Sequence, residues 1–143
     1  MKNIIIGSDH TGFELKSFLK QYLQNNNYNV VDVGTDNPSS CDYPDIANAV
    51  ATHIKNNTED FGILICGTGL GMSISVNRYP FIRGAVLYSK DVAKLAREHN
   101  NANVAILGAR TFSKEENLEF LKTFLSSNFS NEERHKRRIE KLS

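Results

Sequence analysis

The sequence contains no tryptophan, only two cysteines and only three prolines among its 143 residues. Cys41 and Cys66 alone cannot build the disulfide framework on which small secreted domains depend. No apolar run approaches the about 18 residues of a membrane-spanning helix, and residues 1–10 hold only three consecutive isoleucines before polar residues. We therefore expect no membrane span, no signal peptide and a cytoplasmic protein.

The sequence also lacks a large excess of either charge: it has 17 Lys and Arg residues and 16 Asp and Glu residues, for a net charge of +1. That balance excludes a global field for nucleic acid, although it allows a local basic patch. The composition is that of a globular protein, with 40% hydrophobic and 23% charged residues. The length predicts a single domain over residues 1–143, large enough to bury a core without metals or disulfides.

Five short apolar runs predict the strands of this domain: Ile4–Ile6, Val30–Val33, Gly62–Cys66, Ala85–Leu87 and Val104–Leu107. They are continuous rather than alternating, which is typical of strands buried on both faces. Between them, apolar residues recur at helical spacing in four stretches: Leu15–Leu23, Ile46–Ile54, Val92–Ala96 and Leu118–Leu125. Strict alternation of strand and helix predicts a three-layer α/β/α, Rossmann-like sandwich around a five-stranded parallel sheet.

The C-terminal segment, residues 131–143, does not fit that core. Its 13 residues include five Lys or Arg and three Glu, and only Ile139 and Leu142 are clearly apolar. We expect a helical arm that is too polar to join the core of its own domain. Two interpretations remain open, a solvated face or an arm that packs on a partner subunit.

The residues that follow each strand matter most for function, because ligands of such folds bind at the carboxyl ends of the strands. Cys66-Gly67-Thr68-Gly69-Leu70-Gly71 follows the third run. Its three alternating glycines leave backbone N–H groups uncovered, and a helix is expected from about Leu70, so an anion can approach closely. Such a setting favours the thiolate of Cys66 as a base or nucleophile, with a small buried hydrophobe as the alternative. Met72 stands where a cysteine phosphatase would need an arginine, which disfavours phosphatase chemistry.

The segment Gly7–Gly12, after the first run, fits neither a G-x-G-x-x-G nucleotide fingerprint nor a Walker loop. Asp9 in this segment can accept protons or ligand hydroxyls, or it caps the following helix. His10 can bind an anion or move a proton.

Four further residues follow strands or end helices. His99 is expected near a helix C-terminus, where it serves as an acid/base group or as a helix cap. Arg110 offers a fixed cation to a phosphate or carboxylate, or it forms a surface ion pair. Asp32 ends the second run, where a dinucleotide fold holds ribose hydroxyls. Tyr43 is expected to line the cleft, and no metal-ligand spacing is present in the sequence.

Taken together, these motifs resemble the ribose-5-phosphate isomerase B family, within the wider group that includes galactose-6-phosphate isomerase. The matching segments are G-S-D-H-x-G at Gly7–Gly12, D-Y-P at Asp42–Pro44, I-L-I-C-G-T-G-x-G at Ile63–Gly71, R-x-H-N-x-A-N-V at Arg97–Val104, G-A-R at Gly108–Arg110, and Arg134-His135 with Arg138. The likeness runs in order from Met1 to about Leu142, and the motifs are specific when taken jointly.

The resemblance implies interconversion of D-ribose 5-phosphate and D-ribulose 5-phosphate through a cis-enediolate, in the non-oxidative pentose phosphate pathway, without metal or cofactor. Cys66 would be the base, because residues 71–74 hold no acid in place of the glutamate that other members use. Thr68 and the backbone N–H groups of Gly67, Gly69 and Gly71 would stabilise the enediolate oxygen. His99 would open the furanose ring.

The same resemblance assigns the binding residues. Asp9 would hold substrate hydroxyls, Tyr43 and Asn100 would complete the pocket, and four cations would bind the phosphate: His10, Arg110, Arg134 and Arg138. A homodimer or homotetramer is implied, with tail arginines reaching a neighbour's site and with neither nucleic acid nor membrane as partner. The alternatives are a hexose 6-phosphate isomerase of galactose or allose type, and a non-catalytic sugar-phosphate or nucleotide-binding module that uses Asp32.

Overall fold

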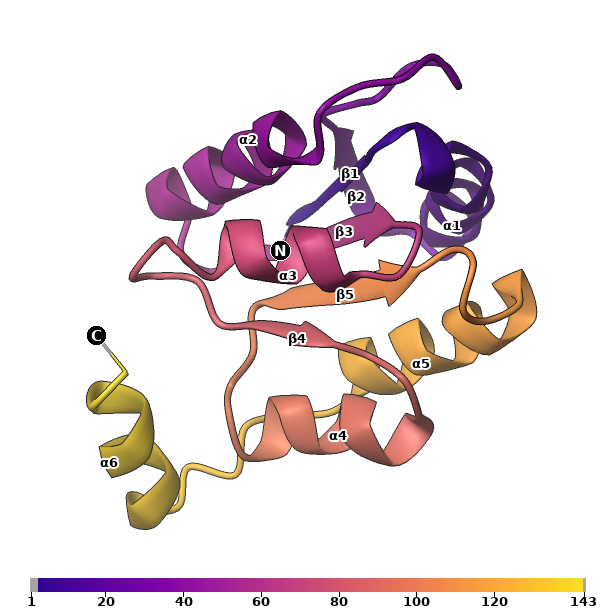
Figure 1. The fold of residues 1–143 in the computed structure, drawn as a ribbon. Helices are drawn as coiled ribbons and strands as arrows, with labels where there is room; N and C mark the ends of the chain where they lie inside the picture. The colour runs from indigo at the N-terminus through magenta and orange to yellow at the C-terminus, as the bar shows by residue number, and fades with distance from the viewer. Residues whose placement is uncertain (1–2, 143) are drawn as a thin grey trace.

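The computed structural model describes residues 3–142, which form a parallel sheet flanked by helices (Figure 1). The strands are β1 (Asn3–Ser8), β2 (Asn29–Asp32), β3 (Phe61–Cys66), β4 (Gly84–Val86) and β5 (Val104–Gly108). The helices are α1 (Phe13–Asn25), α2 (Tyr43–Asn56), α3 (Leu70–Val76), α4 (Lys90–Glu98), α5 (Lys114–Ser126) and α6 (Glu133–Glu140), with a short 3-10 turn, η1 (His10–Gly12). The five predicted strands and the Rossmann-like fold are therefore confirmed.

The strand order is β2-β1-β3-β5-β4, and all four neighbouring pairs are parallel. The central strands β1, β3 and β5 are buried over nearly their whole length, which accounts for their continuous apolar runs. The edge strands β2 and β4 are only partly buried.

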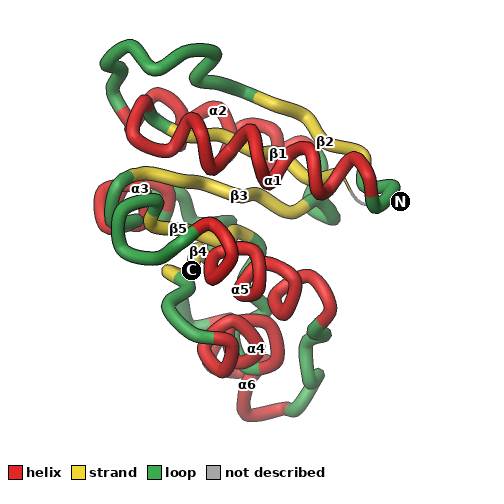
Figure 2. Tube along the Cα trace, turned by 90° about the vertical axis from the view of Figure 1, so that its right-hand side faces the viewer, coloured by secondary structure: helices red, strands yellow, loops and turns green. Residues whose placement is uncertain are grey.

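Two apolar cores, one on each face of the sheet, give the domain its three layers (Figure 2). On one face, α1, α4 and α5 pack against alternate residues of the central strands, with Leu19 and Phe124 fully buried. On the other face, α2 and α3 pack on the intervening residues, with Val50 and Met72 fully buried. Burial of a side chain of this size contributes about 1.5–3 kcal/mol, so these cores account for much of the stability.

The buried face of α4 differs from the predicted stripe of Val92–Ala96. Leu95 is 42% exposed, whereas Arg97 is only 5% exposed. The Arg97 guanidinium lies 4.7 Å from the centre of the Phe61 ring, and its Nη1 donates to the Ala102 carbonyl at 2.6 Å. Because an aromatic face and a carbonyl oxygen compensate its charge, this arginine takes a buried position that hydrophobic spacing assigned to leucine.

Helix α6 lies outside the three layers, beyond the end of α4 (Figures 1 and 2). Of its eight residues only His135 is buried. The predicted helical arm is thus present and stays apart from the two cores. Within residues 3–142 we find no helix with both the length and the apolar character that crossing a membrane requires.

Candidate active site

The carboxyl ends of β1 and β3 lie side by side, while the chain leaves β1 for β2 on one side and enters β3 on the other. Parallel sheets bind ligands at such a switch point. The Asp9 N–H donates to the Ile65 carbonyl at 3.1 Å, which joins the segment after β1 to the end of β3. The residues that follow these two strands therefore share one edge of the sheet.

The glycine loop, residues 66–71, forms the centre of this edge. Cys66 is 5% exposed, and the Gly69 N–H donates to its Sγ at 3.2 Å. Gly69 has a φ of 82°, in the left-handed region that glycine enters without strain. The Gly67 and Thr68 N–H groups make no hydrogen bond within residues 3–142. The loop thus places one N–H donor on the sulfur and leaves two N–H groups beside it that can bind an oxyanion.

Asp9 supplies a carboxylate beside the glycine loop. It is 7% exposed, and its Oδ1 accepts from the Thr11 N–H at 2.9 Å and from the Thr11 hydroxyl. Asp9 thus caps η1, as one of its two interpretations predicted. Its Oδ2 makes no hydrogen bond within the described chain, so one oxygen stays available to a ligand hydroxyl.

Arg110 borders the same loop from the end of β5. The Ala109 N–H donates to the Cys66 carbonyl at 2.9 Å, and the Arg110 N–H donates to the Gly67 carbonyl at 2.8 Å. A Cβ added to Gly67 would lie 3.4 Å from the Arg110 Cδ and 3.6 Å from the Thr11 Oγ1. The guanidinium stem and Thr11 therefore both lie against Gly67, where a larger residue would press on them.

The β2–α2 connection, residues 33–42, brings two further predicted residues to this edge. The His10 Nδ1 accepts from the Cys41 N–H at 3.3 Å, so the neutral ring carries its proton on Nε2. Tyr43, the first residue of α2, lies with its ring on Gly71, because a Cβ at that position would be only 2.9 Å from two ring carbons. The carboxyl edge therefore gathers His10 and Tyr43 with Asp9, Cys66 and the glycine loop.

Asp32 is not available to a nucleotide. Its carboxylate accepts from the Lys16 Nζ at 2.7 and 3.0 Å, from the Lys20 Nζ at 3.2 Å and from the Gly34 N–H at 2.9 Å. Burial alone would raise the pKa of Asp32, but these hydrogen bonds outweigh it and the pKa is lowered. Because both oxygens are occupied, the residue that best supported a nucleotide-binding module holds the β2 end together instead.

The remaining predicted residues lie at the opposite edge of the sheet. His99 caps the C-terminus of α4 and precedes β5, whereas Cys66 pairs with Gly108 at the far end of that strand. A rise of about 3.3 Å per residue separates the two ends of β5 by about 13 Å. Figure 1 shows the end of α4 and all of α6 at the end of the sheet away from the β3 arrowhead. Within one chain, His99 and Cys66 are therefore not brought together.

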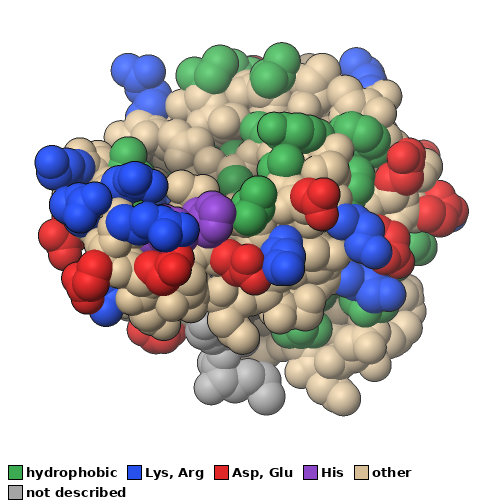
Figure 3. All heavy atoms as spheres, turned by 90° about the horizontal axis from the view of Figure 1, so that it is seen from below, with side chains coloured by type: hydrophobic (Ala, Val, Ile, Leu, Met, Phe, Trp, Pro, Cys, Tyr) green, Lys and Arg blue, Asp and Glu red, His purple; other side chains and the backbone are tan. Residues whose placement is uncertain are grey.

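This second half of the predicted site is built around two stacked histidines. The His99 and His135 ring centres are 4.3 Å apart, and the Arg134 Nε donates to the His135 Nε2 at 3.3 Å. Figure 3 shows a cluster of Lys and Arg side chains beside histidine atoms at one end of the molecule. Sequence reasoning missed His135 as a site residue. Its signal was the i,i+4 spacing to Ile139, which marks one face of an otherwise charged helix.

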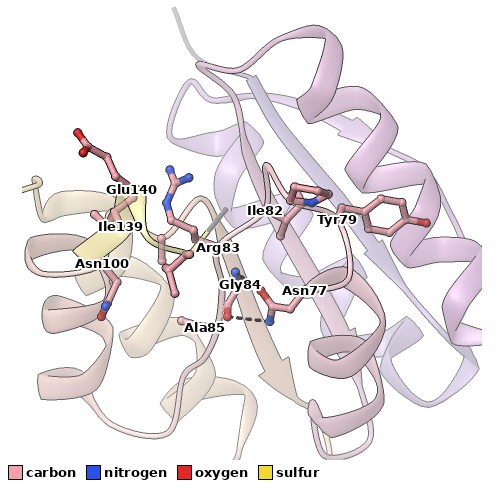
Figure 4. Close-up of a pocket in the computed structure, with 12 residues that line it drawn as sticks. Asn77, Tyr79, Ile82, Arg83, Gly84, Ala85, Asn100, Ile139 and Glu140 are labelled. Atoms are coloured by element: carbon pink, nitrogen blue, oxygen red, sulfur yellow. Dashed lines mark hydrogen bonds between the residues drawn. The ribbon is translucent and has the colours of Figure 1, made fainter. Parts of the chain in front are cut away.

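A cavity of about 600 Å³ opens beside this half (Figure 4). It lies between β4, the α3–β4 connection and the end of α6, and Asn100 and Arg83 are among its lining residues. Asn77 braces one wall through two hydrogen bonds with the Gly84 backbone, at 2.8 and 3.0 Å. Among residues 3–142 no group of three His, Cys, Asp or Glu side chains is arranged to hold a metal ion.

Comparison with known proteins agrees with the motifs at both edges. Residues 4–142 match the family model described as Ribose/Galactose Isomerase. The probable ribose-5-phosphate isomerase B of Mycoplasma genitalium is 43% identical, over 98% of this chain and 93% of its own length. A ribose 5-phosphate isomerase from Thermotoga maritima is 49% identical, with a TM-score of 0.95 over 99% of this chain and 97% of that one.

One further solved structure contains a ligand. The M. genitalium ribose-5-phosphate isomerase B, with bound ribulose-5-phosphate, has a TM-score of 0.94, with coverage of 98% of this chain and 93% of that one. The match extends from β1 to α6, so it includes both the glycine loop and the histidine pair. The chain therefore belongs to the ribose/galactose isomerase family.

Proposed function

We propose that the chain interconverts D-ribose 5-phosphate and D-ribulose 5-phosphate at a site assembled from two copies of the chain. The observation that carries the proposal is the Cys66 thiol, with the Gly69 N–H on its sulfur and the unpaired N–H groups of Gly67 and Thr68 beside it. Family membership adds the aldose–ketose chemistry, and the relatives named ribose-5-phosphate isomerase B add the pentose phosphate.

The proposed chemistry is a proton shuttle. The Cys66 thiolate removes the proton from C2 of the open-chain aldose, and the electrons of that bond form the C1–C2 double bond while O1 becomes an oxyanion. The Gly67 and Thr68 N–H groups and the Thr68 hydroxyl stabilise this enediolate, at about 3–4 kcal/mol for each donor removed. The proton then returns to C1 as the 2-hydroxyl proton moves to O1, which leaves the ketose.

The other residues of the carboxyl edge hold the substrate over the sulfur. Asp9 offers its free Oδ2 to the sugar hydroxyls, and Tyr43 closes the wall above Gly71. His10 and Arg110 attract the phosphate, which lies at the far end of the sugar from the reacting carbons. Remote phosphate binding orients C2 over Cys66 and so lowers the barrier of the proton transfer.

A second copy supplies the rest of the site. His99 would open the ring, with Asn100 beside it and with Arg134 and Arg138 on the phosphate, but all four lie at the opposite edge from their own Cys66. In a two-fold dimer, the Cys66 edge of each copy meets the His99 edge of its partner, and two equal sites form.

Helix α3 offers an apolar surface for that pairing. Leu70 and Ile74 are one helical turn apart, adjoin the glycine loop, and are 62% and 66% exposed. Exposed apolar side chains of this kind mark an interaction surface. The cavity beside Asn100 would receive that surface, because Ile139 and Leu142 line it.

The test is isomerisation of ribose 5-phosphate in the presence of a chelator, for the wild type, Cys66→Ala and the matched Cys41→Ala. We expect turnover in the wild type and in Cys41→Ala, and a loss of about 10²–10⁴-fold or more in Cys66→Ala. A folded wild type that isomerises only galactose or allose 6-phosphate would correct the substrate. A folded wild type without turnover on either would refute the proposal.

A further inference from the structure

His135 is the one buried residue of α6. Its side chain is 4% exposed, while its neighbours along α6 are exposed or half-buried. It lies on the His99 ring, with 4.3 Å between the ring centres and 35° between the ring planes. The His135 imidazole therefore brings α6 into contact with the residue proposed for ring opening.

The hydrogen-bond partners of His135 fit one tautomer of its neutral ring. The Arg134 Nε–H can only donate, so the His135 Nε2 at 3.3 Å must be an unprotonated acceptor. The proton of the neutral ring is then on Nδ1, which faces the Ser130 Oγ at 2.8 Å and the Glu132 Oε2 at 3.4 Å. Both of these oxygens accept, so every polar atom of the neutral ring is satisfied.

The same ring is tied back to α4. The Ser130 N–H donates to the Glu98 carbonyl at 3.0 Å, directly before His99. Ser130 thus holds the end of α4 with its backbone and His135 with its hydroxyl. His99 and His135 are fixed relative to each other both by ring stacking and by this short hydrogen-bonded link.

Most of the charged groups around His135 lower its pKa. Its burial lowers the pKa of His135, and the charges of His99, Arg134 and Arg138 lower it further. Only Glu132 raises it. Because the pKa is lowered, the ring stays neutral at neutral pH and takes up a proton only as the pH falls.

On the basis of the proposed function, we propose that His135 is a positioning residue, whose neutral imidazole holds the His99 ring and the Arg134 guanidinium in their working arrangement. Protonation of His135 at Nε2 would place its new N–H group opposite the Arg134 Nε–H, so the hydrogen bond would be lost and Arg134 would be released. It would also place a positive charge against His99, which disfavours the imidazolium that acid-assisted ring opening requires. Phosphate binding and ring opening would then weaken together on the acid side.

Two substitutions separate these contributions. His135→Phe keeps an aromatic ring on His99 but removes the acceptor for Arg134, so we expect KM for ribose 5-phosphate to rise about 10- to 100-fold, with a smaller change in kcat. His135→Gln can keep the acceptor but cannot titrate, so we expect KM near the wild-type value and a flatter acid limb of kcat/KM. Lys136→Ala, an exposed neighbour that pairs with Glu133 at 3.6 Å, should leave both parameters unchanged.

The profiles are measured from pH 5 to 9, with circular dichroism to confirm folding. Wild-type KM in His135→Phe at every pH, or an equal loss in His135→Gln and His135→Phe, would overturn the positioning role. Nitrogen-15 NMR of the wild-type histidine rings tests the arrangement without activity: at pH 7 we expect His135 neutral with its proton on Nδ1. A proton on Nε2 would overturn the inference even in an active enzyme, whereas an inactive wild type with the expected ring signals would count against the proposed function alone.

Discussion

Two inactive variants of this chain should restore activity when they are assembled together. In one chain, Cys66 and His99 are at opposite edges of the sheet, separated by at least the about 13 Å length of β5. If each active site takes Cys66 from one copy and His99 from the other, Cys66→Ala and His99→Asn damage different halves of the site.

The expected recovery follows from counting sites. Random pairing of equal amounts of the two variants makes half of the dimers mixed, and each mixed dimer has one doubly damaged site and one intact site. About one quarter of all sites should therefore regain wild-type turnover. A tetramer built from such dimers gives the same fraction, because each site still draws on two copies.

The assay is isomerisation of ribose 5-phosphate after the two variants are unfolded together in denaturant and refolded. Each variant carried alone through the same procedure gives the background. Cys66→Ala mixed with Asp9→Asn is the matched control, because both changes lie at one edge and no pairing can produce an intact site. No recovery above background in the Cys66 and His99 mixture would refute the shared site.

Three further changes test the fold around the site. Lys16→Met removes a 2% exposed ammonium from Asp32 and the Thr35 carbonyl, and should cost about 3 kcal/mol of unfolding free energy in urea, while a cost below about 1 kcal/mol would contradict the ion pair's role. Because the Asp32 pKa is lowered from its usual 3.8, the wild type should lose this stabilisation only as the pH falls below about 3.8, whereas acid titration of Asp32→Asn should show no such loss. Gly71→Ala suits helix α3 but pushes on the Tyr43 ring, so kcat/KM should fall about tenfold or more at an unchanged melting temperature; unchanged turnover would argue against Tyr43 as a wall of the site.

The strands could be predicted from the sequence because a parallel sheet covered on both faces demands continuous apolar runs. The buried face of a helix is harder to predict where a long polar side chain is buried together with groups that compensate its charge. In α4, Arg97 replaces Leu95 in the interior because the Phe61 ring and the Ala102 carbonyl compensate a charge that hydrophobic spacing alone places outside.

Part of the candidate site could likewise be predicted from the sequence, and part could not. Asp9 and the glycine loop follow strands directly, so their common edge could be predicted from strand order alone. His99 ends α4 and precedes β5, so it lies at the amino edge, and the predicted alternation of strands and helices already assigns that edge to it. The contact between His99 and His135 joins segments more than thirty residues apart, so it required the three-dimensional structure.

Strand β4 is bonded only to β5, although β5 follows it in the sequence and lies between it and β3. During synthesis β4 leaves the ribosome with no neighbour to pair with, and it must wait until residues 104–108 have emerged. The first three strands can associate earlier, because β2 and β3 both pair with β1, which has already been made. The hydrogen bonds from residues 109 and 110 to the glycine loop also arrive with β5, and both apolar cores include β5 residues, so a nascent chain completes neither core nor the geometry around Cys66 until β5 has emerged.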